Sequence, residues 1–231
     1  MPTGSLRINE IFHSIQGEST WAGTPCVFVR LTGCHLRCTY CDTEYAFNEG
    51  RWMSIADLIE AVGERGTDLV QVTGGEPLLQ PAVHELMAGL CDLGKTVLLE
   101  TSGACDISAC DPRVIRILDL KTPGSGEVER NRMENLDDLT ERDEVKFVIC
   151  DRADYDWACA IVQEHAIGDR CRAVLFSPVF EQAPGDQITG ADELDPVALA
   201  SWLLESPPKG QTVRMQLQMH KHIWDPQMRG V

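Results

Sequence analysis

Short apolar runs alternate along this chain with longer segments whose apolar residues recur at every third or fourth position. Short runs rich in valine, leucine and isoleucine are typical of buried strands, whereas the second spacing is typical of helices with one buried face. The alternation predicts an α/β fold with a parallel sheet. We expect its core strands at 26–31, 69–73, 96–100, 116–121, 145–150 and 172–176.

Helical spacing is clearest at 54–64, 82–93 and 153–164. Ser54 suits the N-cap of the first segment, because its hydroxyl can accept a hydrogen bond from the first turn, and Gly94 suits the end of the second. Such β-α units predict a partial barrel of about six parallel strands with helices outside, abbreviated relative to a full (β/α)6 barrel. Barrels of this kind collect their functional residues at the carboxyl ends of the strands.

Composition limits the function further. A chain of 231 residues, 43% of them hydrophobic, suits one domain, 1–231, with a continuous core. No stretch approaches the ~18 apolar residues of a membrane span, so we expect a soluble, cytoplasmic protein without a membrane partner. With 20 basic against 36 acidic residues, the formal charge of −16 disfavours direct binding of nucleic acid.

The loop after the first predicted strand carries three cysteines, Cys34, Cys38 and Cys41, with Cys-x3-Cys-x2-Cys spacing. A [4Fe–4S] cluster is usually held by four thiolates, so three leave one iron open to a small molecule. Structural zinc is disfavoured, since it usually takes four paired ligands and His35 lies too close to Cys34 to complete a set. Disulfides are disfavoured by the chain length and by the lack of an apolar secretion signal.

Two further motifs follow strand ends. Gly74-Gly75-Glu76-Pro77 comes after the second predicted strand, where paired glycines let a ligand approach the backbone closely. The next strand ends in Glu100-Thr101-Ser102-Gly103, for which a hydrogen-bonding turn and a direct cofactor contact are both open. Both motifs are expected on the barrel rim that carries the cysteine loop.

The cysteine spacing and the Gly-Gly-Glu-Pro segment resemble the radical S-adenosylmethionine (SAM) superfamily. Other segments narrow this resemblance to the 7-carboxy-7-deazaguanine synthase family, and the similarity runs from about Ile8 to Pro226. These segments are Ile-Gln-Gly-Glu at 15–18, Phe-Val-Arg at 28–30, Cys-Asp-Thr at 41–43 and Gln-Met-His-Lys-His-Ile-Trp-Asp-Pro at 218–226.

The resemblance implies a lyase that converts 6-carboxy-5,6,7,8-tetrahydropterin to 7-carboxy-7-deazaguanine with loss of ammonia, on the deazapurine pathway toward queuosine. It implies a [4Fe–4S] cluster, SAM and Mg2+ as cofactors. In this family a 5′-deoxyadenosyl radical abstracts hydrogen from C6 of the pterin, the ring contracts, and SAM is regenerated. A homodimer and an electron donor such as flavodoxin or ferredoxin are also implied.

The same resemblance implies roles for individual residues, none of them a conventional nucleophile. Cys34, Cys38 and Cys41 would ligate the cluster, and the hydroxyl of Thr43 would bind Mg2+. SAM would contact Tyr40, Gly75, Asp119, Leu120, Lys121, Ser177, Pro178, Val179 and Phe180. The pterin would contact Ile15, Gln16, Gly17, Arg30, Thr73 and Pro226.

Some of these residues have ordinary structural alternatives. Tyr40 could pack the loop, Thr43 could cap a turn, and Pro226 could simply end an element. Arg30 lies in an apolar strand, where a charge is costly unless it is paired. No acidic partner is evident in the sequence, which favours a bidentate pair with the substrate carboxylate.

The remaining cysteines match no compact ligand motif, and most of them are expected to be ordinary buried thiols; they are Cys26, Cys91, Cys105, Cys110, Cys150, Cys159 and Cys171. His220 and His222 are expected to alternate on a final strand, and so to face opposite ways. Two competing functions stay open. Another radical SAM enzyme, such as a glycyl-radical activase, would leave both chain ends unexplained, and a noncatalytic iron–sulfur or zinc protein would not cleave SAM.

Overall fold

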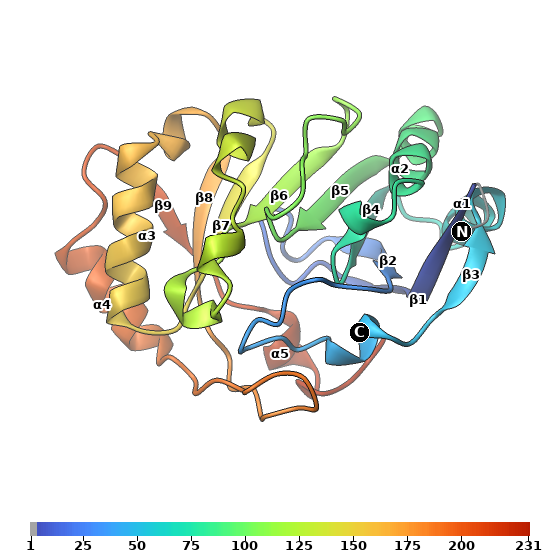
Figure 1. Cartoon of the computed structure of the whole chain (residues 1–231). Coiled ribbons are helices and arrows are strands. Elements are labelled where there is room, and N and C mark those ends of the chain that lie inside the picture. Colours follow the sequence, from blue (N-terminus) through green and yellow to red (C-terminus); the bar gives the residue numbers. More distant parts are fainter. Residues whose placement is uncertain (1–3) are drawn as a thin grey trace.

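The computed structural model describes residues 4–231, and through them runs one curved sheet of nine strands (Figure 1). Their spatial order is β3-β1-β2-β4-β5-β6-β7-β8-β9. The first three residues of the predicted domain lie outside this description. The strands are β1 (Ser5–Ile15), β2 (Pro25–Leu31), β3 (Arg51–Ser54), β4 (Leu69–Gly74), β5 (Thr96–Thr101), β6 (Ile115–Asp119), β7 (Glu144–Ile149), β8 (Ala173–Pro178) and β9 (Val213–Met215).

The pairing confirms the predicted parallel sheet. Each neighbouring pair from β2 through β9 is parallel, whereas β1 runs antiparallel to both β2 and β3. The six predicted core strands correspond to β2 and β4 to β8, and their ends agree within two residues. Helices α1 to α4 lie outside the curved sheet in Figure 1, which gives the expected partial barrel.

The three predicted helices are confirmed as α1 (Ile55–Gly63), α2 (Val83–Asp92) and α3 (Arg152–Glu164), and α4 (Pro196–Glu205) and α5 (His220–Ile223) follow. Ser54 caps α1, since its hydroxyl accepts a hydrogen bond from the amide of Asp57 at 3.1 Å. Gly94 follows α2 with φ of 78°, the left-handed conformation that ends many helices. Single 3-10 turns lie at Glu44–Phe47, Pro77–Leu79, Pro123–Ser125, Val128–Arg130, Met133–Asp138 and Ile167–Asp169.

The expectation of a final strand at His220 and His222 is wrong. Both residues lie in the short helix α5, where the amide of Trp224 donates to the carbonyl of His220 at 3.0 Å. The amide of Met219, just before the helix, donates to the carbonyl of Gly17 at 2.9 Å. A contact with the opposite end of the chain thus sets the local conformation. No helix within residues 4–231 is long and apolar enough to cross a membrane.

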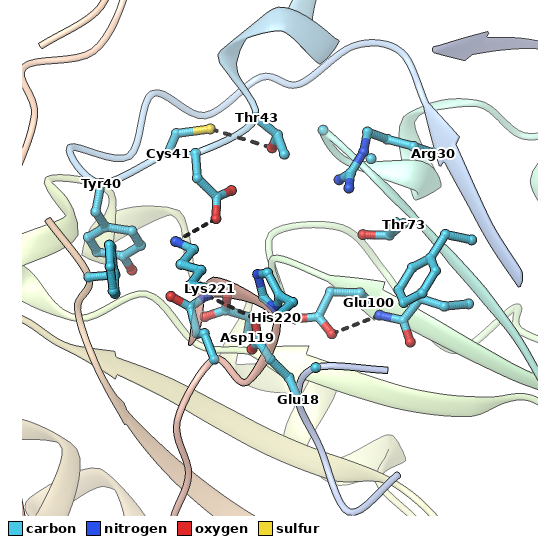
Figure 2. Close-up of a pocket in the computed structure, with 18 of the residues that line it drawn as sticks. Glu18, Arg30, Tyr40, Cys41, Thr43, Thr73, Glu100, Asp119, His220 and Lys221 are labelled. Carbon is cyan, nitrogen blue, oxygen red and sulfur yellow. Dashed lines mark hydrogen bonds and ion pairs between the residues drawn. The ribbon is translucent and has the colours of Figure 1, made fainter. Parts of the chain in front are cut away.

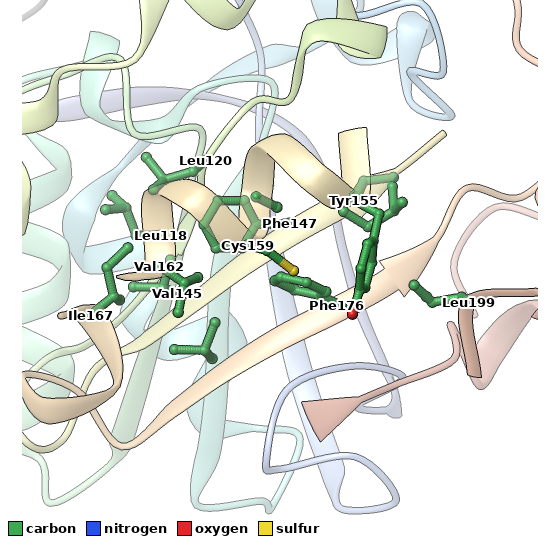
Figure 3. Close-up of a cluster of buried hydrophobic side chains, with 14 of the residues drawn as sticks. Leu118, Leu120, Val145, Phe147, Tyr155, Cys159, Val162, Ile167, Phe176 and Leu199 are labelled. Carbon is green, nitrogen blue, oxygen red and sulfur yellow. The ribbon is translucent and has the colours of Figure 1, made fainter. Parts of the chain in front are cut away.

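The outer face of the sheet packs against the helices. Between α3 and strands β6 to β8, the rings of Phe147 and Phe176 meet edge to face with centroids 5.4 Å apart (Figure 3). Tyr155 of α3 stacks edge-on against Phe176, and its hydroxyl donates to the carbonyls of Trp202 and Ser206 at 3.0 and 2.8 Å. These contacts therefore hold α4 against α3 and stabilise the outer side of the sheet.

Strand alternation divides the inner face into two zones. Near the amino ends of the strands, buried apolar side chains fill the interior: Cys26, Leu69, Leu98, Ile115 and Ile117. Nearer the carboxyl ends, side chains on the same face are mostly polar or charged: Arg30, Gln71, Thr73, Glu100, Asp119 and Lys146. Because positions on one face recur every second residue, Arg30, Glu100 and Asp119 lie on the same face of their strands as Cys26, Leu98 and Ile117.

Candidate active site

A cavity of about 420 Å3 opens at the carboxyl ends of the parallel strands (Figure 2). Its wall combines these strand ends with the cysteine loop after β2 and with the segment after β9. The structure brings all but three of the predicted site residues to this wall. They are Ile15, Gln16, Gly17, Arg30, Cys34, Cys38, Tyr40, Cys41, Thr43, Thr73, Gly75, Asp119, Lys121, Val179, Phe180 and Pro226.

The three exceptions are Leu120, Ser177 and Pro178, which do not line the cavity. Leu120 is fully buried in the core beneath α3, because neighbouring positions along an extended chain face opposite ways. Its neighbours Asp119 and Lys121 face the cavity for the same reason. Ser177 and Pro178 end β8 and are buried within the sheet.

The cysteine loop is braced from several sides. The amide of Gly33 donates to the carbonyl of Ala46 at 2.8 Å, and the amide and hydroxyl of Thr39 donate to the carbonyls of Ser125 and Gly124 at 3.0 and 2.9 Å. The two Thr39 bonds join the loop to the segment after β6. All three thiols of the loop face the cavity.

Burial raises the pKa of the Cys34, Cys38 and Cys41 thiols, that of Cys41 to about 11. Such thiols stay protonated near neutral pH until a metal takes the place of the proton. Within residues 4–231, no three Cys, His, Asp or Glu side chains converge as ligands of one metal ion. The cysteines of an iron–sulfur cluster bind different irons, so a cluster does not require such convergence.

The Gly-Gly-Glu-Pro segment lies directly against the cysteine loop. A Cβ at Gly75 would lie 2.7 Å from the Cβ of Cys34, so only glycine permits this approach. The amide of Glu76 donates to the carbonyl of Gly33 at 2.8 Å. Two segments that are 40 residues apart in the chain are thereby held together by backbone contacts.

The side chain of Glu76 is fully buried, which its position in the motif did not indicate. Its carboxylate accepts hydrogen bonds from the hydroxyl of Thr101 at 2.9 Å and from the amide and hydroxyl of Ser102 at 2.8 and 2.6 Å. The Glu-Thr-Ser-Gly segment at 100–103 is therefore a hydrogen-bonding turn that holds Glu76. Both Thr101 and Ser102 also reach the cavity wall.

Arg30 has the acidic partner that the sequence did not reveal. Its Nε lies 2.8 Å from Oε1 of Glu10, which also accepts a hydrogen bond from the hydroxyl of Tyr45 at 3.0 Å. Glu10 and Arg30 are directly paired across β1 and β2, beside an irregularity in the register. The inference that Arg30 lacks a protein partner is thus wrong, although its side chain still faces the cavity (Figure 2).

Tyr40, Asp119 and Lys121 form one group beside the cysteine loop. Lys121 pairs with Oδ2 of Asp119 at 3.0 Å, and its ammonium lies 5.6 Å from the centre of the Tyr40 ring. Within residues 4–231, Oδ1 of Asp119 and the hydroxyl of Tyr40 are buried without a hydrogen-bond partner. Buried polar atoms of this kind usually have a partner, so both are available to a ligand.

The cavity also contains an ionic group that the sequence analysis missed. The ammonium of Lys146 lies 2.9 Å from Glu18, 2.5 Å from Glu100 and 3.4 Å from Asp119. Burial opposes ionisation of Glu18, but the Lys146 charge outweighs it and lowers the pKa of Glu18 to about 2. Burial raises the pKa of Glu100 to about 7 against the same attraction. The charge of Lys146 within the mostly apolar strand β7 was the available signal.

The segment after β9 forms the remaining wall. Lys221 pairs with Asp42, the neighbour of Cys41, at 2.8 Å. Burial acts to raise the pKa of Asp42, but the charge of Lys221 outweighs it and lowers this pKa. His220 lies against Gly17, where a Cβ would come within 2.9 Å of the imidazole Cγ. Burial lowers the pKa of His220, which favours a neutral ring. The cysteine loop and the predicted pterin segment are therefore joined by residues near position 220.

Sequence comparisons agree with this arrangement. A family model described as the radical SAM superfamily matches residues 28–119, which include the cysteine loop and the Gly-Gly-Glu-Pro segment. A 7-carboxy-7-deazaguanine synthase of Koribacter versatilis (strain Ellin345) is 44% identical over 98% of this chain and 100% of its own. That of Chlorobaculum tepidum is 45% identical over 98% of this chain and 97% of its own. The chain belongs to the 7-carboxy-7-deazaguanine synthase family.

Solved structures share the fold. The crystal structure of QueE from Escherichia coli matches with a TM-score of 0.70 at 22% identity, covering 94% of this chain and 95% of that one. Streptococcus suis SuiB bound to S-adenosylmethionine matches with a TM-score of 0.58 at 12% identity, covering 80% of this chain and 48% of that one. The partial barrel of this 7-carboxy-7-deazaguanine synthase family member is the radical SAM fold, and that superfamily uses a [4Fe–4S] cluster and SAM.

Among residues 4–231, Cys34, Cys38 and Cys41 are the cysteines that line the cavity, and the other seven lie elsewhere in this family member. All ten cysteines are free thiols within residues 4–231. Cys26 and Cys159 are buried in the cores, and burial raises the pKa of Cys26 to about 12. The prediction of ordinary buried thiols holds for these two, while the other five are half-buried.

Proposed function

We propose that this chain is a radical SAM lyase that converts 6-carboxy-5,6,7,8-tetrahydropterin to 7-carboxy-7-deazaguanine with loss of ammonia. The observation that carries the proposal is one cavity in which the cysteine loop and Arg30 lie on the same wall. A cluster loop alone fits many radical enzymes. A half-buried guanidinium, oriented by Glu10 in the same cavity, fits a small substrate that bears a carboxylate.

Cys34, Cys38 and Cys41 would hold the [4Fe–4S] cluster. The donor set fits, since three thiols on one braced loop face the cavity and leave one iron open for SAM. When bound, the cluster and SAM supply a 5′-deoxyadenosyl radical that abstracts hydrogen from C6 of the pterin. The protein limits water around this step, because Cys38 is nearly buried at the cavity wall.

SAM would lie between the cysteine loop and the strand ends. Gly75 offers backbone, and the free oxygens of Asp119 and Tyr40 offer hydrogen-bond partners. Lys121, Val179 and Phe180 complete this side of the wall. Leu120, Ser177 and Pro178, the other predicted SAM contacts, do not line the cavity.

The pterin would lie toward β1 and the segment after β9. Glu10 holds Arg30 through Nε, which leaves the two terminal nitrogens to form a bidentate pair with the substrate carboxylate. The stacked rings of Phe12 and Phe28, 4.8 Å apart, and the 15–17 segment offer a surface for a flat ring. Thr73 and Pro226 line the same space.

Mg2+ would bind beside the substrate carboxylate through the hydroxyl of Thr43. Magnesium takes oxygen ligands and keeps several waters, so one hydroxyl and the substrate oxygens suffice. The hydroxyl of Thr43 faces the cavity 3.8 Å from the sulfur of Cys41 (Figure 2). A bound Mg2+ would orient the carboxylate during ring contraction.

The reaction also needs partners outside this chain. Reduction of the cluster requires an electron donor, and we propose a flavodoxin or a ferredoxin. We further propose a homodimer in the cytoplasm. Light scattering would test the dimer, and reconstitution with each reductant would identify the donor.

Anaerobic turnover tests the function directly. The cluster-reconstituted, reduced protein is incubated with SAM, Mg2+ and the carboxytetrahydropterin, and 7-carboxy-7-deazaguanine is followed by mass spectrometry. We expect product from the wild type and from Cys91→Ala, whose thiol lies on α2 outside the cavity, and none from Cys38→Ala. SAM cleavage without product would support a different radical SAM enzyme, and no SAM cleavage would refute the radical chemistry.

A further inference from the structure

Lys146 projects from β7 into the cavity, and its side chain is only 7% exposed. The three carboxylates around its ammonium come from distant parts of the chain. Glu18 follows β1, Glu100 lies near the end of β5, and Asp119 ends β6 (Figure 2). One buried cation therefore joins three separate wall segments.

This arrangement uses most of the bonding capacity of the ammonium. A lysine has three N–H groups, and three carboxylates surround this one. Bonds between charged groups are about twice as strong as those between neutral groups. Lys146 donates hydrogen bonds to Glu18 and Glu100, and its charge also lies within ion-pair distance of Asp119. Its influence on a bound molecule therefore acts mainly through these carboxylates.

Two of the three carboxylates lie on the proposed pterin side of the cavity, and the third lies on the proposed SAM side. Glu18 accepts a hydrogen bond from Gln218 at 2.8 Å and adjoins the 15–17 segment of the proposed pterin site. Glu100 accepts from Gln71 at 3.3 Å on the same side. Asp119 lies on the proposed SAM side with its Oδ1 free of partners within residues 4–231.

We propose that Lys146 is a positioning residue that holds the SAM side and the pterin side of the cavity in one arrangement through the three carboxylates around it. The proposal rests on the proposed function for the identity of the two ligands. Without the ammonium, buried carboxylates would repel one another, and they would move apart or take up protons. Both binding sites would then lose their geometry together.

A second buried ion pair provides a matched control. Arg116 at the start of β6 pairs with Asp143 at 2.6 Å, and these side chains are 10% and 0% exposed. Neither residue lines the cavity. Arg116→Met therefore breaks a buried ion pair in the same sheet without changing the wall of the site.

The experiment compares Lys146→Met, Lys146→Met/Glu100→Gln and Arg116→Met with the wild type, all loaded with cluster. Affinities for SAM and for the pterin are measured by anaerobic calorimetry, and 5′-deoxyadenosine is counted against product. We expect Lys146→Met to weaken both ligands by at least about tenfold and to raise the 5′-deoxyadenosine formed per product. The double variant, which also loses one negative charge, should recover SAM affinity to within about threefold of the wild type.

Several outcomes would overturn the proposal. Loss of pterin affinity alone would mean that Lys146 contacts the substrate, and equal losses in Arg116→Met would mean general loosening of the sheet. If Lys146→Met does not fold, the double variant must fold and bind SAM, or charge balance is not the role of Lys146. If the wild type binds SAM but does not convert the pterin, the proposed function fails, while the SAM affinities still decide the role of Lys146.

Discussion

Replacing Gly75 with alanine would place a methyl group against the cysteine loop. The new Cβ would lie 2.7 Å from the Cβ of Cys34 and 2.7 Å from the carbonyl carbon of Gly33. Ordinary contacts begin at 3.4 Å and the carbonyl oxygen of Gly33 would be closer still, so one of the two segments must retreat by more than about 0.7 Å. Neither segment can move freely, because the amide of Glu76 is bonded to the carbonyl of Gly33.

The expected effects follow from this overlap. Overpacking of a buried contact costs about 1–3 kcal/mol, so the free energy of unfolding should fall by that amount. A misplacement of about 1 Å at a reacting centre costs up to about 100-fold in rate, so SAM cleavage should fall about 10-fold to 100-fold. The assay counts 5′-deoxyadenosine by chromatography in the reconstituted protein, with iron and sulfide per chain measured in parallel.

Gly63→Ala is the matched control. Gly63 ends α1, and a Cβ there would meet nothing within 4 Å, so stability and SAM cleavage should be unchanged or slightly improved. If Gly75→Ala retained its cluster and cleaved SAM within about twofold of the wild type, the close approach of the two segments would not be required for this chemistry.

Three further changes test other parts of the site. Glu76→Gln replaces one buried acceptor oxygen by a donor and should lower the Tm by about 6–12 °C in calorimetry. The control is Glu85→Gln on the exposed side of α2, which should leave the Tm unchanged. Arg30→Lys should raise the KM for the pterin about 10-fold or more without changing SAM cleavage in its absence. Because burial raises the pKa of Glu100 to about 7, its carboxylate forms as the pH rises through that value; kcat/KM should rise there, and Glu100→Gln should flatten the profile.

The core of the fold could be predicted because it depends on local patterns. The six parallel strands are short, apolar and separated by helices with one buried face, so each can be recognised from a few consecutive residues. The added strands were harder. Strand β1 is mostly half-buried and mixes Arg7, Asn9 and Glu10 with apolar residues, and β9 has only three residues. Their conformations depend on pairing with neighbours, which a local pattern does not encode.

The candidate site could likewise be predicted only where it depends on contiguous motifs. The cysteine loop and the Gly-Gly-Glu-Pro segment are contiguous motifs, and the structure brings them together as expected. The partner of Arg30 was missed because Glu10 lies across an antiparallel pair whose strand β1 was not predicted. The group around Lys146 draws on residues that are up to 128 positions apart, so only the folded sheet brings them together.

The contact between Lys221 and Asp42 has a consequence for the order in which the site forms during synthesis. The cysteine loop precedes its covering segment by about 180 residues, and chains grow at about 5–20 residues per second. The loop is therefore made about 10–40 s before the residues that cover it. During that interval the segment that carries Lys221 does not yet exist, so this side of the cysteine loop closes only when synthesis is nearly complete.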